Sequence, residues 1–361
     1  MRTTATGCLC SGLIIGALVI VSALAQAPSG QSEEPKVDGI PVSKLSIRTT
    51  KLTDNLYILH GIAPPPPGTN VSDGRYGGSI GVLTGPDGIF QVDAQYPPKE
   101  ISEKVLAAIR QFSNAPIRYI VNTHFHTDHT GGNDFFVKTG ATVLSQPSLR
   151  ERLVNQRNYP VGGRPAVTYE GPVTYYMNGE EIELIPVRPA HTDGDTFVYF
   201  KNADVFMMGD IGRASYPNGN KAAGGGDTDG LIDAFGIAIG KGGPNTKYIA
   251  GHGPIYSRAD LMAYQDTIKV TRAHIWALIQ QGKTVDEVIA ARPTADQDEK
   301  VLKQGFGHGD AAMYYDEGTF PRFRNSDVYI RGTYDMLKPP APPAPAAPPT
   351  PTPATTSRSS N

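Results

Sequence analysis

The chain has 361 residues, which is enough for one large domain or two small ones with a sizeable hydrophobic core. Hydrophobic residues make up 39% of it and charged residues 19%, a composition typical of globular proteins and unlike that of fibrous or mostly disordered ones. The formal net charge is -2, so the chain lacks the excess of basic residues that is typical of nucleic-acid-binding proteins, and no nucleic-acid partner is expected.

The N-terminus has the features of a secretory signal. Arg2 precedes an almost wholly apolar run over residues 12–24, and small-x-small cleavage patterns follow at 23–25 and 25–27. The run is shorter than the roughly 20 residues that a membrane span needs, and no later stretch is apolar for long enough. We therefore predict a signal peptide at residues 1–27, cleaved from a soluble periplasmic or secreted protein, with an uncleaved N-terminal anchor as the alternative.

The two cysteines, Cys8 and Cys10, both lie within this predicted signal. Cleavage would leave a mature chain without cysteine, which excludes disulfides, thiolate nucleophiles and cysteine-ligated metal sites. Any catalysis is therefore expected to depend on oxygen and nitrogen groups.

Residues 28–43 are polar and proline-spaced, and they are predicted to form a linker. At the other end, residues 338–361 form a Pro/Ala/Thr/Ser tract that has too little apolar surface to offset the entropy of ordering, so a disordered tail is expected. Residues 44–337 are then predicted to form the folded domain.

Within this domain, short apolar runs alternate with helical patterns. Apolar residues recur at helical spacing over 99–112, and helices are also expected at 258–281 and 284–291. Residues 216–230 are glycine-rich and are expected to form a loop. The alternation favours α/β layers in which helices cover sheets. The predicted strands are residues 56–59, 80–84, 89–92, 117–122, 142–144, 182–187, 196–200, 205–208 and 248–250.

A dense group of potential metal ligands follows the predicted strand 117–122. His124 and His126 are two residues apart, so at an extended strand end they point the same way, and Asp128 and His129 follow as the chain turns. Imidazole nitrogens and carboxylate oxygens are the ligands that zinc takes at about 2.0–2.2 Å. The sequence therefore predicts a metal site at this strand end.

Three further positions follow other predicted strands: His191 in the sequence PAHTDGD, Asp210 in MGD and His252 in GHGP. Each is a weak signal alone, because a Gly-Asp turn and a single histidine are common. Five of the chain's eight histidines nevertheless fall into these motifs and the 124–129 segment, which makes chance clustering improbable. Sites in α/β folds gather at such strand ends, so we expect these side chains to converge.

In these motifs and in their order, the sequence resembles the metallo-β-lactamase superfamily of hydrolases. The matching motifs are HFHTDH (124–129), AHTDGD (190–195), GD (209–210) and GHGP (251–254). The resemblance implies an αββα sandwich, two mixed β-sheets flanked by helices, with a metal cleft at one edge. Carried over by matching position, a first metal ion would be held by His124, His126 and His191, and a second by Asp128, His129 and His252, with Asp210 bridging the two.

Two divalent ions about 3.5–4 Å apart can share a water molecule and lower its pKa towards neutrality. The bridging hydroxide is expected to attack an amide, ester, lactone or β-lactam-type bond of a small-molecule substrate, while the first metal polarises the substrate oxygen. Asp128 is expected to orient this nucleophile and to relay its proton to the leaving group. Zinc is the expected metal, and iron or manganese are alternatives that such a site also accepts.

Asp210 departs from one branch of the family. The β-lactamase subclass with a thiolate ligand has cysteine at this position, whereas the glyoxalase II and lactonase branches have aspartate. Carbapenem-type β-lactamase activity is therefore in doubt, and a glyoxalase II-like thioesterase is an alternative, against which the predicted export signal stands. A non-catalytic metal-binding scaffold is a further alternative, which the retention of all seven ligand positions opposes.

Overall fold

The computed structural model describes residues 34–37, 39–64, 74–212, 216–217, 224–304 and 326–338. The predicted signal peptide lies outside the described residues, as does the predicted tail beyond Lys338. The signal peptide and the disordered tail therefore remain predictions from the sequence.

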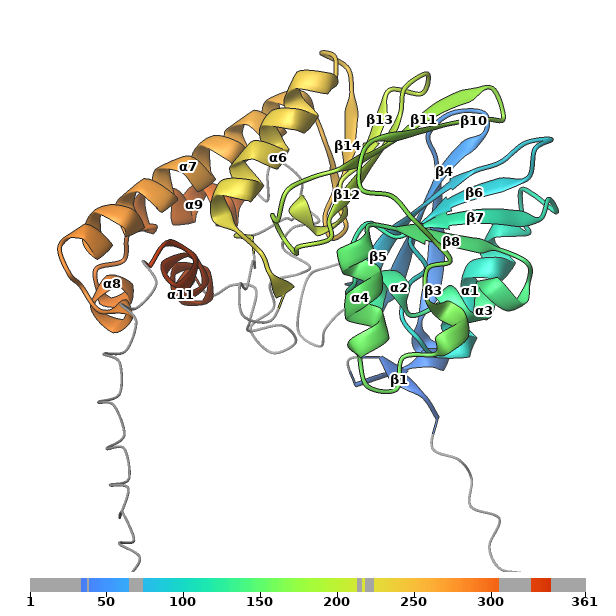
Figure 1. Cartoon of the computed structure of the whole chain (residues 1–361), viewed down its shortest axis with the longest axis horizontal. Coiled ribbons are helices and arrows are strands. Elements are labelled where there is room, and N and C mark those ends of the chain that lie inside the picture. Colours follow the sequence, from blue (N-terminus) through green and yellow to red (C-terminus); the bar gives the residue numbers. More distant parts are fainter. Residues whose placement is uncertain are drawn as a thin grey trace, which may run out of the picture. The chain divides into compact units, whose positions relative to one another are not determined.

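Two mixed β-sheets form the centre of the fold (Figure 1). In the first sheet β3 to β6 are antiparallel neighbours and β6 to β9 are parallel neighbours. In the second, β10 to β13 are antiparallel, β14 is parallel to β13, and β15 returns antiparallel. The seven strands of the first sheet are β3 (Ser46–Lys51), β4 (Leu56–Ala63), β5 (Gly74–Leu83), β6 (Ile89–Val92), β7 (Ile117–Val121), β8 (Thr142–Ser145) and β9 (Val167–Thr168). The six of the second are β10 (Val173–Met177), β11 (Glu180–Pro186), β12 (Thr196–Phe200), β13 (Val205–Met207), β14 (Lys247–Ile249) and β15 (Ile255–Tyr256).

Helices cover the outer faces of both sheets. α1 (Lys99–Ile109) and α3 (Asn133–Lys138) share a hydrophobic cluster with the first sheet. A second cluster joins the other sheet to α6 (Thr228–Lys241), α7 (Arg258–Gln280), α8 (Val285–Ala290), α9 (Ala295–Gln304) and α11 (Ser326–Leu337). Side chains of both sheets meet in a third cluster between them. This is an αββα sandwich, so the fold prediction is confirmed.

The main elements follow from local sequence. All four residues of β6 are buried, as expected for a strand covered on both faces, and three of them, Ile89, Phe90 and Val92, are apolar. In α1 the buried positions Ile101, Val105 and Ile109 recur at helical spacing. α7 begins with a capping box: the Ser257 side chain accepts a hydrogen bond from the Asp260 backbone N–H, and the Asp260 side chain accepts one from the Ser257 backbone N–H.

Helix α6 begins at Thr228, inside the segment that was expected to be a loop. The side chain of Asp227 accepts a hydrogen bond of 2.8 Å from the Gly230 backbone and so caps the helix. Gly230, Gly236 and Gly240 lower the intrinsic helix propensity of this stretch, which is why its sequence did not predict a helix. At Gly230 an added Cβ would overlap the carbonyl oxygen of Pro189, so the glycine permits close packing there.

Part of the predicted linker packs onto the fold. β1 (Lys36–Val37) pairs with β2 (Ile40–Pro41), and the short 3-10 helix η1 (Val42–Lys44) follows. Val37 and Val42 are buried in a small hydrophobic cluster with α1. The packed part of the chain therefore begins several residues before residue 44.

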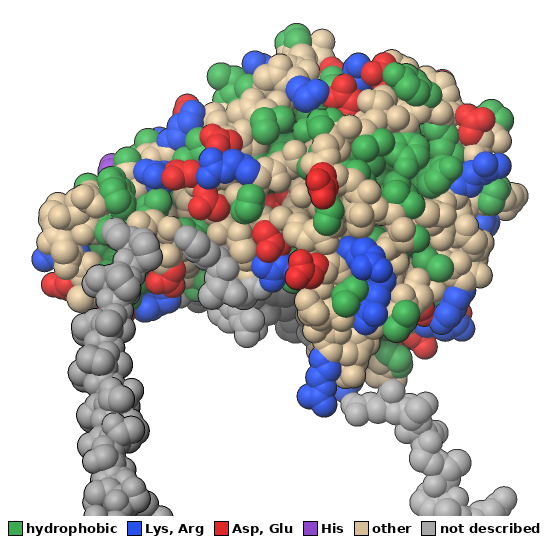
Figure 2. Space-filling view, viewed as in Figure 1, with side chains coloured by type: hydrophobic (Ala, Val, Ile, Leu, Met, Phe, Trp, Pro, Cys, Tyr) green, Lys and Arg blue, Asp and Glu red, His purple; other side chains and the backbone are tan. Residues whose placement is uncertain are grey.

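The surface carries charges of both signs. On the face that Figure 2 shows, acidic and basic side chains are interspersed, in keeping with the small net charge of -2. Among the helices of the described ranges, none has the length and apolar character needed to cross a membrane.

Candidate metal centre

The structure brings all seven predicted ligand side chains together. Each follows the C-terminal end of a strand: the 124–129 segment follows β7, His191 follows β11, Asp210 lies in the 3-10 helix η3 (Gly209–Ile211) after β13, and His252 follows β14. β11, β13 and β14 run in the same direction, because β11 and β13 are both antiparallel to β12 and β14 is parallel to β13. Their ends therefore lie at one edge, as the sequence indicated.

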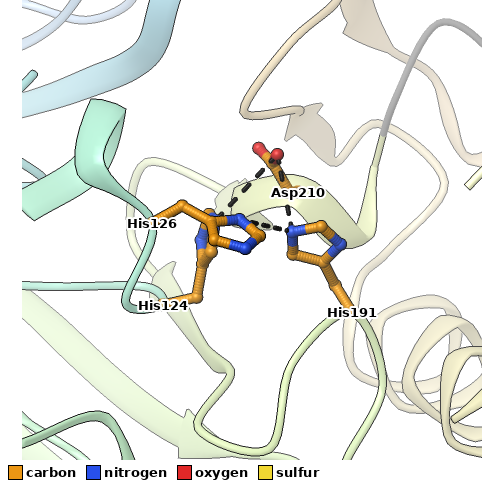
Figure 3. A group of neighbouring side chains, drawn as sticks. All are labelled: His124, His126, His191 and Asp210. Carbon is orange, nitrogen blue, oxygen red and sulfur yellow. Dashed lines mark hydrogen bonds and ion pairs between the residues drawn. The ribbon is translucent and has the colours of Figure 1, made fainter. Parts of the chain in front are cut away.

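A first group consists of His124, His126, His191 and Asp210 (Figure 3). Nδ1 of His126 lies 3.0 Å from Nε2 of His124 and 3.0 Å from Nε2 of His191. Oδ2 of Asp210 lies 3.9 Å from Nε2 of His124 and 3.6 Å from Nε2 of His191. Three ring nitrogens and one carboxylate oxygen thus point at a common space.

A second group consists of Asp128, His129 and His252. Oδ2 of Asp128 lies 2.9 Å from Nε2 of His252 and 3.5 Å from Nε2 of His129. Asp210 also reaches this group, with Oδ1 3.2 Å from Nε2 of His129 and Oδ2 3.3 Å from Nε2 of His252. Its carboxylate therefore lies between the two groups, which is the position that a bridging ligand occupies.

These separations fit metal ligands. Two ligands of one tetrahedral ion, each about 2.0–2.1 Å from it, lie roughly 3.3 Å apart, close to the distances found within each group. Among the described residues the buried Nε2 of His129 has no hydrogen-bond partner of good geometry, although carboxylate oxygens surround it. A ring nitrogen buried in this way is well placed to ligate a cation. The donor set contains nitrogen and oxygen only, which suits zinc and other divalent ions.

Exposure differs within the cluster. The side chains of His124 and His129 are 0% exposed and that of Asp210 is 2% exposed, whereas those of Asp128 and His252 are 14% and 12% exposed. Solvent therefore reaches the cluster at Asp128 and His252, and also at His126, whose side chain is partly exposed.

Asp93 supports the cluster and was not singled out from the sequence. It follows β6 directly and has a φ of 62°, a left-handed conformation that is uncommon for a residue other than glycine. Its Oδ2 lies 2.7 Å from Nδ1 of His129 and accepts a 2.7 Å hydrogen bond from Oγ1 of Thr123. Its Oδ1 accepts a 2.8 Å bond from the Thr123 backbone. Such a carboxylate fixes the orientation of the His129 ring, so that Nε2 points into the cluster.

Two glycines give the ligands room. A Cβ added at Gly78 would overlap the His129 ring, and one added at Gly251 would overlap the Asp210 carboxylate. Ser79, next to Gly78, donates hydrogen bonds of 2.8 and 3.0 Å to the carbonyls of Ala250 and Gly251. Strand β5 therefore packs directly against the ligand at His129 and against the loop that carries His252.

The loop that carries His191 is fixed by two acidic residues. Asp195 accepts hydrogen bonds from the backbone and side chain of Thr192 at 2.8 and 2.6 Å, and its burial raises its pKa to about 7. Asp193 forms a bidentate ion pair with Arg152 of α4 (Pro147–Asn155), with both distances 2.6 Å. The loop is thereby tied to itself and to a neighbouring helix.

The charge states differ from residue to residue in the metal-free cluster. Burial lowers the pKa of His129, but the carboxylates of Asp128, Asp93 and Asp210 outweigh burial and raise that pKa well above its usual value, so a metal at this ring would displace a proton. Burial, and then the neighbouring His129, hold the pKa of His124 well below its usual value, so its ring is neutral and keeps a lone pair for a metal. Burial raises the pKa of Asp128, but the rings of His129 and His252 outweigh burial and lower that pKa well below its usual range. Asp128 is therefore ionised at neutral pH, as a hydrogen-bond acceptor and candidate ligand has to be.

Comparison with known proteins agrees with this geometry. The family model of the metallo-beta-lactamase superfamily matches residues 82–240, a stretch that contains every candidate ligand except His252. Among solved structures, a metallo-beta-lactamase from Pontibacter korlensis superposes with a TM-score of 0.53 at 18% sequence identity. The superposition covers 62% of this chain and 99% of that one, so the two share a fold.

Two curated relatives match shorter stretches. The 2,4-dinitroanisole O-demethylase subunit alpha of Nocardioides sp. (strain JS1661) is 31% identical over 130 residues, which is 36% of this chain and 39% of that protein. The linear primary-alkylsulfatase of Pseudomonas sp. (strain ATCC 19151) is 37% identical over 81 residues, which is 21% of this chain and 15% of that protein. The chain thus spans well under two thirds of either relative.

Proposed function

The chain belongs to the metallo-beta-lactamase superfamily, and on that premise we propose that it is an exported hydrolase that depends on two divalent metal ions, zinc in the first instance. The observation that carries this proposal is the convergence of seven imidazole and carboxylate side chains into two groups that share Asp210. The apolar run at residues 12–24 supports export to the periplasm or beyond the cell.

In this proposal His124, His126 and His191 hold the first ion, Asp128, His129 and His252 hold the second, and Asp210 contacts both. Divalent ions bound in this way lower the pKa of water towards neutrality and polarise a substrate oxygen.

Asp128 is the carboxylate of the set that faces solvent most openly, and it is ionised at neutral pH. It is therefore suited to accept a hydrogen bond from the attacking water and to orient it. Asp93 fixes the orientation of the His129 ring, and the buried Asp195 stabilises the loop that carries His191. No serine or cysteine nucleophile is needed.

The bond to be cleaved is proposed to be an amide, ester, lactone or β-lactam-type bond. The names of the two relatives point to a methyl aryl ether and to alkyl sulfates as their substrates, so both bond types belong in the same substrate panel. A thioester belongs there as well, because an aspartate at position 210 is shared with the glyoxalase II branch that the sequence resembles.

The test is metal analysis of the purified protein together with this substrate panel, with and without a chelator. We expect about two metal equivalents per chain, loss of hydrolysis on chelation, and recovery on addition of zinc. Asp128→Asn is expected to lower kcat by about 100-fold or more, without unfolding the protein. Asp54→Asn removes a fully exposed carboxylate from the surface and is the matched control, which keeps wild-type activity. Hydrolysis that survives complete metal removal would refute the proposal.

A further inference from the structure

A pocket of about 440 Å³ lies beside the metal centre, and we call it the α4 pocket. Its walls are the turn at residues 125–127, one face of α4 with Gln156 after it, and Asp193. His126 belongs both to this wall and to the first group of candidate metal ligands. Figure 1 shows α4 next to α2 (Thr127–Thr130), which follows that turn. A molecule bound at the cluster can therefore extend into the pocket.

The face of α4 towards the pocket is polar, and helical spacing explains why. Ser148, Glu151, Arg152 and Asn155 follow the i, i+3, i+4, i+7 pattern of one helix face, and all four line the pocket. The buried residues of the helix, Leu149 and Leu153, form a small cluster with Tyr159 and Phe125 instead. The helix thus packs through one face and leaves the other to the pocket.

The charges in this wall are unbalanced. Arg152 is the one cation among the described residues that line the pocket, and Asp193 already neutralises it through the bidentate pair. Its guanidinium also lies 4.9 Å from the centroid of the Phe125 ring. Glu151, which is exposed, adds a second carboxylate, so these residues carry one net negative charge.

The remaining groups suit a polar but uncharged or cationic ligand. The Phe125 ring provides an apolar surface, and the amides of Asn155 and Gln156 can each donate and accept hydrogen bonds. The volume lies within the range of about 300–1,000 Å³ typical of small-molecule sites. Among the described residues of this wall, Arg152 is already paired with Asp193, and no further guanidinium or ammonium is present to bind a carboxylate or sulfate of a substrate.

We propose that the α4 pocket is a substrate subsite that accepts an uncharged or cationic group next to the scissile bond and disfavours an anionic one. This inference rests on the proposed function and narrows it to substrates without a carboxylate or sulfate on that side of the bond. Glu151 is the residue that sets the preference, because Arg152, which Glu151 also attracts, is already held by Asp193 through two hydrogen bonds, and Glu151 remains as the second carboxylate.

The test uses three p-nitrophenyl esters of similar length whose acyl chains end in a methyl, a trimethylammonium or a carboxylate group. The quantity measured is kcat/KM for each ester at low ionic strength, in the wild type, Glu151→Gln and Glu151→Lys. A unit charge on residue 151 and a unit charge on the ester, roughly 8 Å apart in water, change binding of that ester about 2.4-fold. The factor enters the cation-to-anion ratio twice, because Glu151 attracts the cationic ester and repels the anionic one. The ratio is therefore expected to fall about sixfold in E151Q and about 30-fold in E151K. The methyl ester is expected to keep its wild-type kcat/KM.

Glu170→Lys is the matched control, since Glu170 is also an exposed glutamate but does not line the pocket, and it is expected to leave the ratio unchanged. Metal-dependent hydrolysis with the same ratio in wild type, E151Q and E151K would overturn the inference while the proposed function stands. If no ester is hydrolysed, calorimetric binding of benzyltrimethylammonium and of benzenesulfonate measures the pocket directly. The inference is supported if the wild type binds the cation more tightly than the anion and E151K binds the anion more tightly than the cation. It is overturned if the ratio of the two affinities is the same in all variants.

Discussion

Replacement of Gly78 by alanine tests whether strand β5 sets the position of a metal ligand. Gly78 has no positive φ, so an alanine there meets no backbone strain. The added Cβ would lie 2.6 Å from Nε2 and 2.7 Å from Nδ1 of His129, distances that real Cβ atoms essentially never show. The His129 ring is fully buried and is bonded to Asp93 at 2.7 Å, so it cannot move without loss of that contact.

The expected effect is a selective loss of affinity at the second metal site. Overpacking of a buried position costs about 1–3 kcal/mol. The metal-free ring can relieve this strain by shifting and weakening its contact with Asp93, whereas a bound metal requires its ligand atom within about 0.2 Å of the ideal distance. Most of the cost should therefore appear as weaker binding, about 5- to 150-fold in Kd at tenfold per 1.4 kcal/mol.

The assay is titration of the metal-free protein with zinc against a chromophoric chelator, together with the Tm of the metal-free form. Gly78→Ala is expected to bind the first equivalent normally and the second more weakly. Gly171→Ala is the matched control, because an added Cβ at Gly171 meets no atom within 4 Å. Two zinc equivalents bound to G78A with wild-type affinity would show that the packing of β5 does not position His129. A large fall in Tm with unchanged affinity would refute the argument in the same way.

Two further substitutions separate support of the site from support of the fold. Asp93→Asn keeps the shape but replaces a carboxylate that orients His129, so the second zinc is expected to bind about 10–100-fold more weakly in the same titration, and unchanged affinity would argue against that role. Ser257→Ala removes the cap of α7, which lies away from the cluster, so it is expected to cost about 1 kcal/mol and to lower Tm by about 2–4 °C. Zinc affinity and kcat should stay at their wild-type values in S257A, and a loss of either would contradict the assignment of Ser257 to the fold alone.

Much of the fold could be predicted from the sequence, because its strands and long helices carry strong local patterns. β12 has an unbroken apolar run over residues 197–200, β6 is apolar apart from Gln91, and α7 has both a capping box and a helical apolar pattern. Helix α6 was missed because three glycines weaken its local signal, and only packing against neighbouring elements stabilises it. Its glycine at position 230 is required by a contact with Pro189, which is far away in sequence.

The metal cluster could be predicted for a different reason, namely that few residue types can hold a divalent ion. The histidines of the 124–129 segment are rare residues at a spacing that brings them together, and this drew attention to the ends of the other strands. Asp93 satisfies the same criterion, since it directly follows a buried strand that is parallel to β7. It was missed because a single aspartate after a strand is common, and its left-handed backbone is visible only in the structure.

The α4 pocket could not be predicted from either kind of signal. Ser148, Glu151, Arg152 and Asn155 form the polar face of an ordinary amphipathic helix, and the sequence alone gives such a face no reason to be anything but solvated. It becomes a pocket wall because Arg152 reaches Asp193, 41 residues later in the chain, and so draws α4 against the loop of His191. Metal ligation constrains residue type, whereas substrate selection depends on where common residue types lie in space. For this reason the choice of substrate, more than the chemistry of the site, has to be learned from the folded chain.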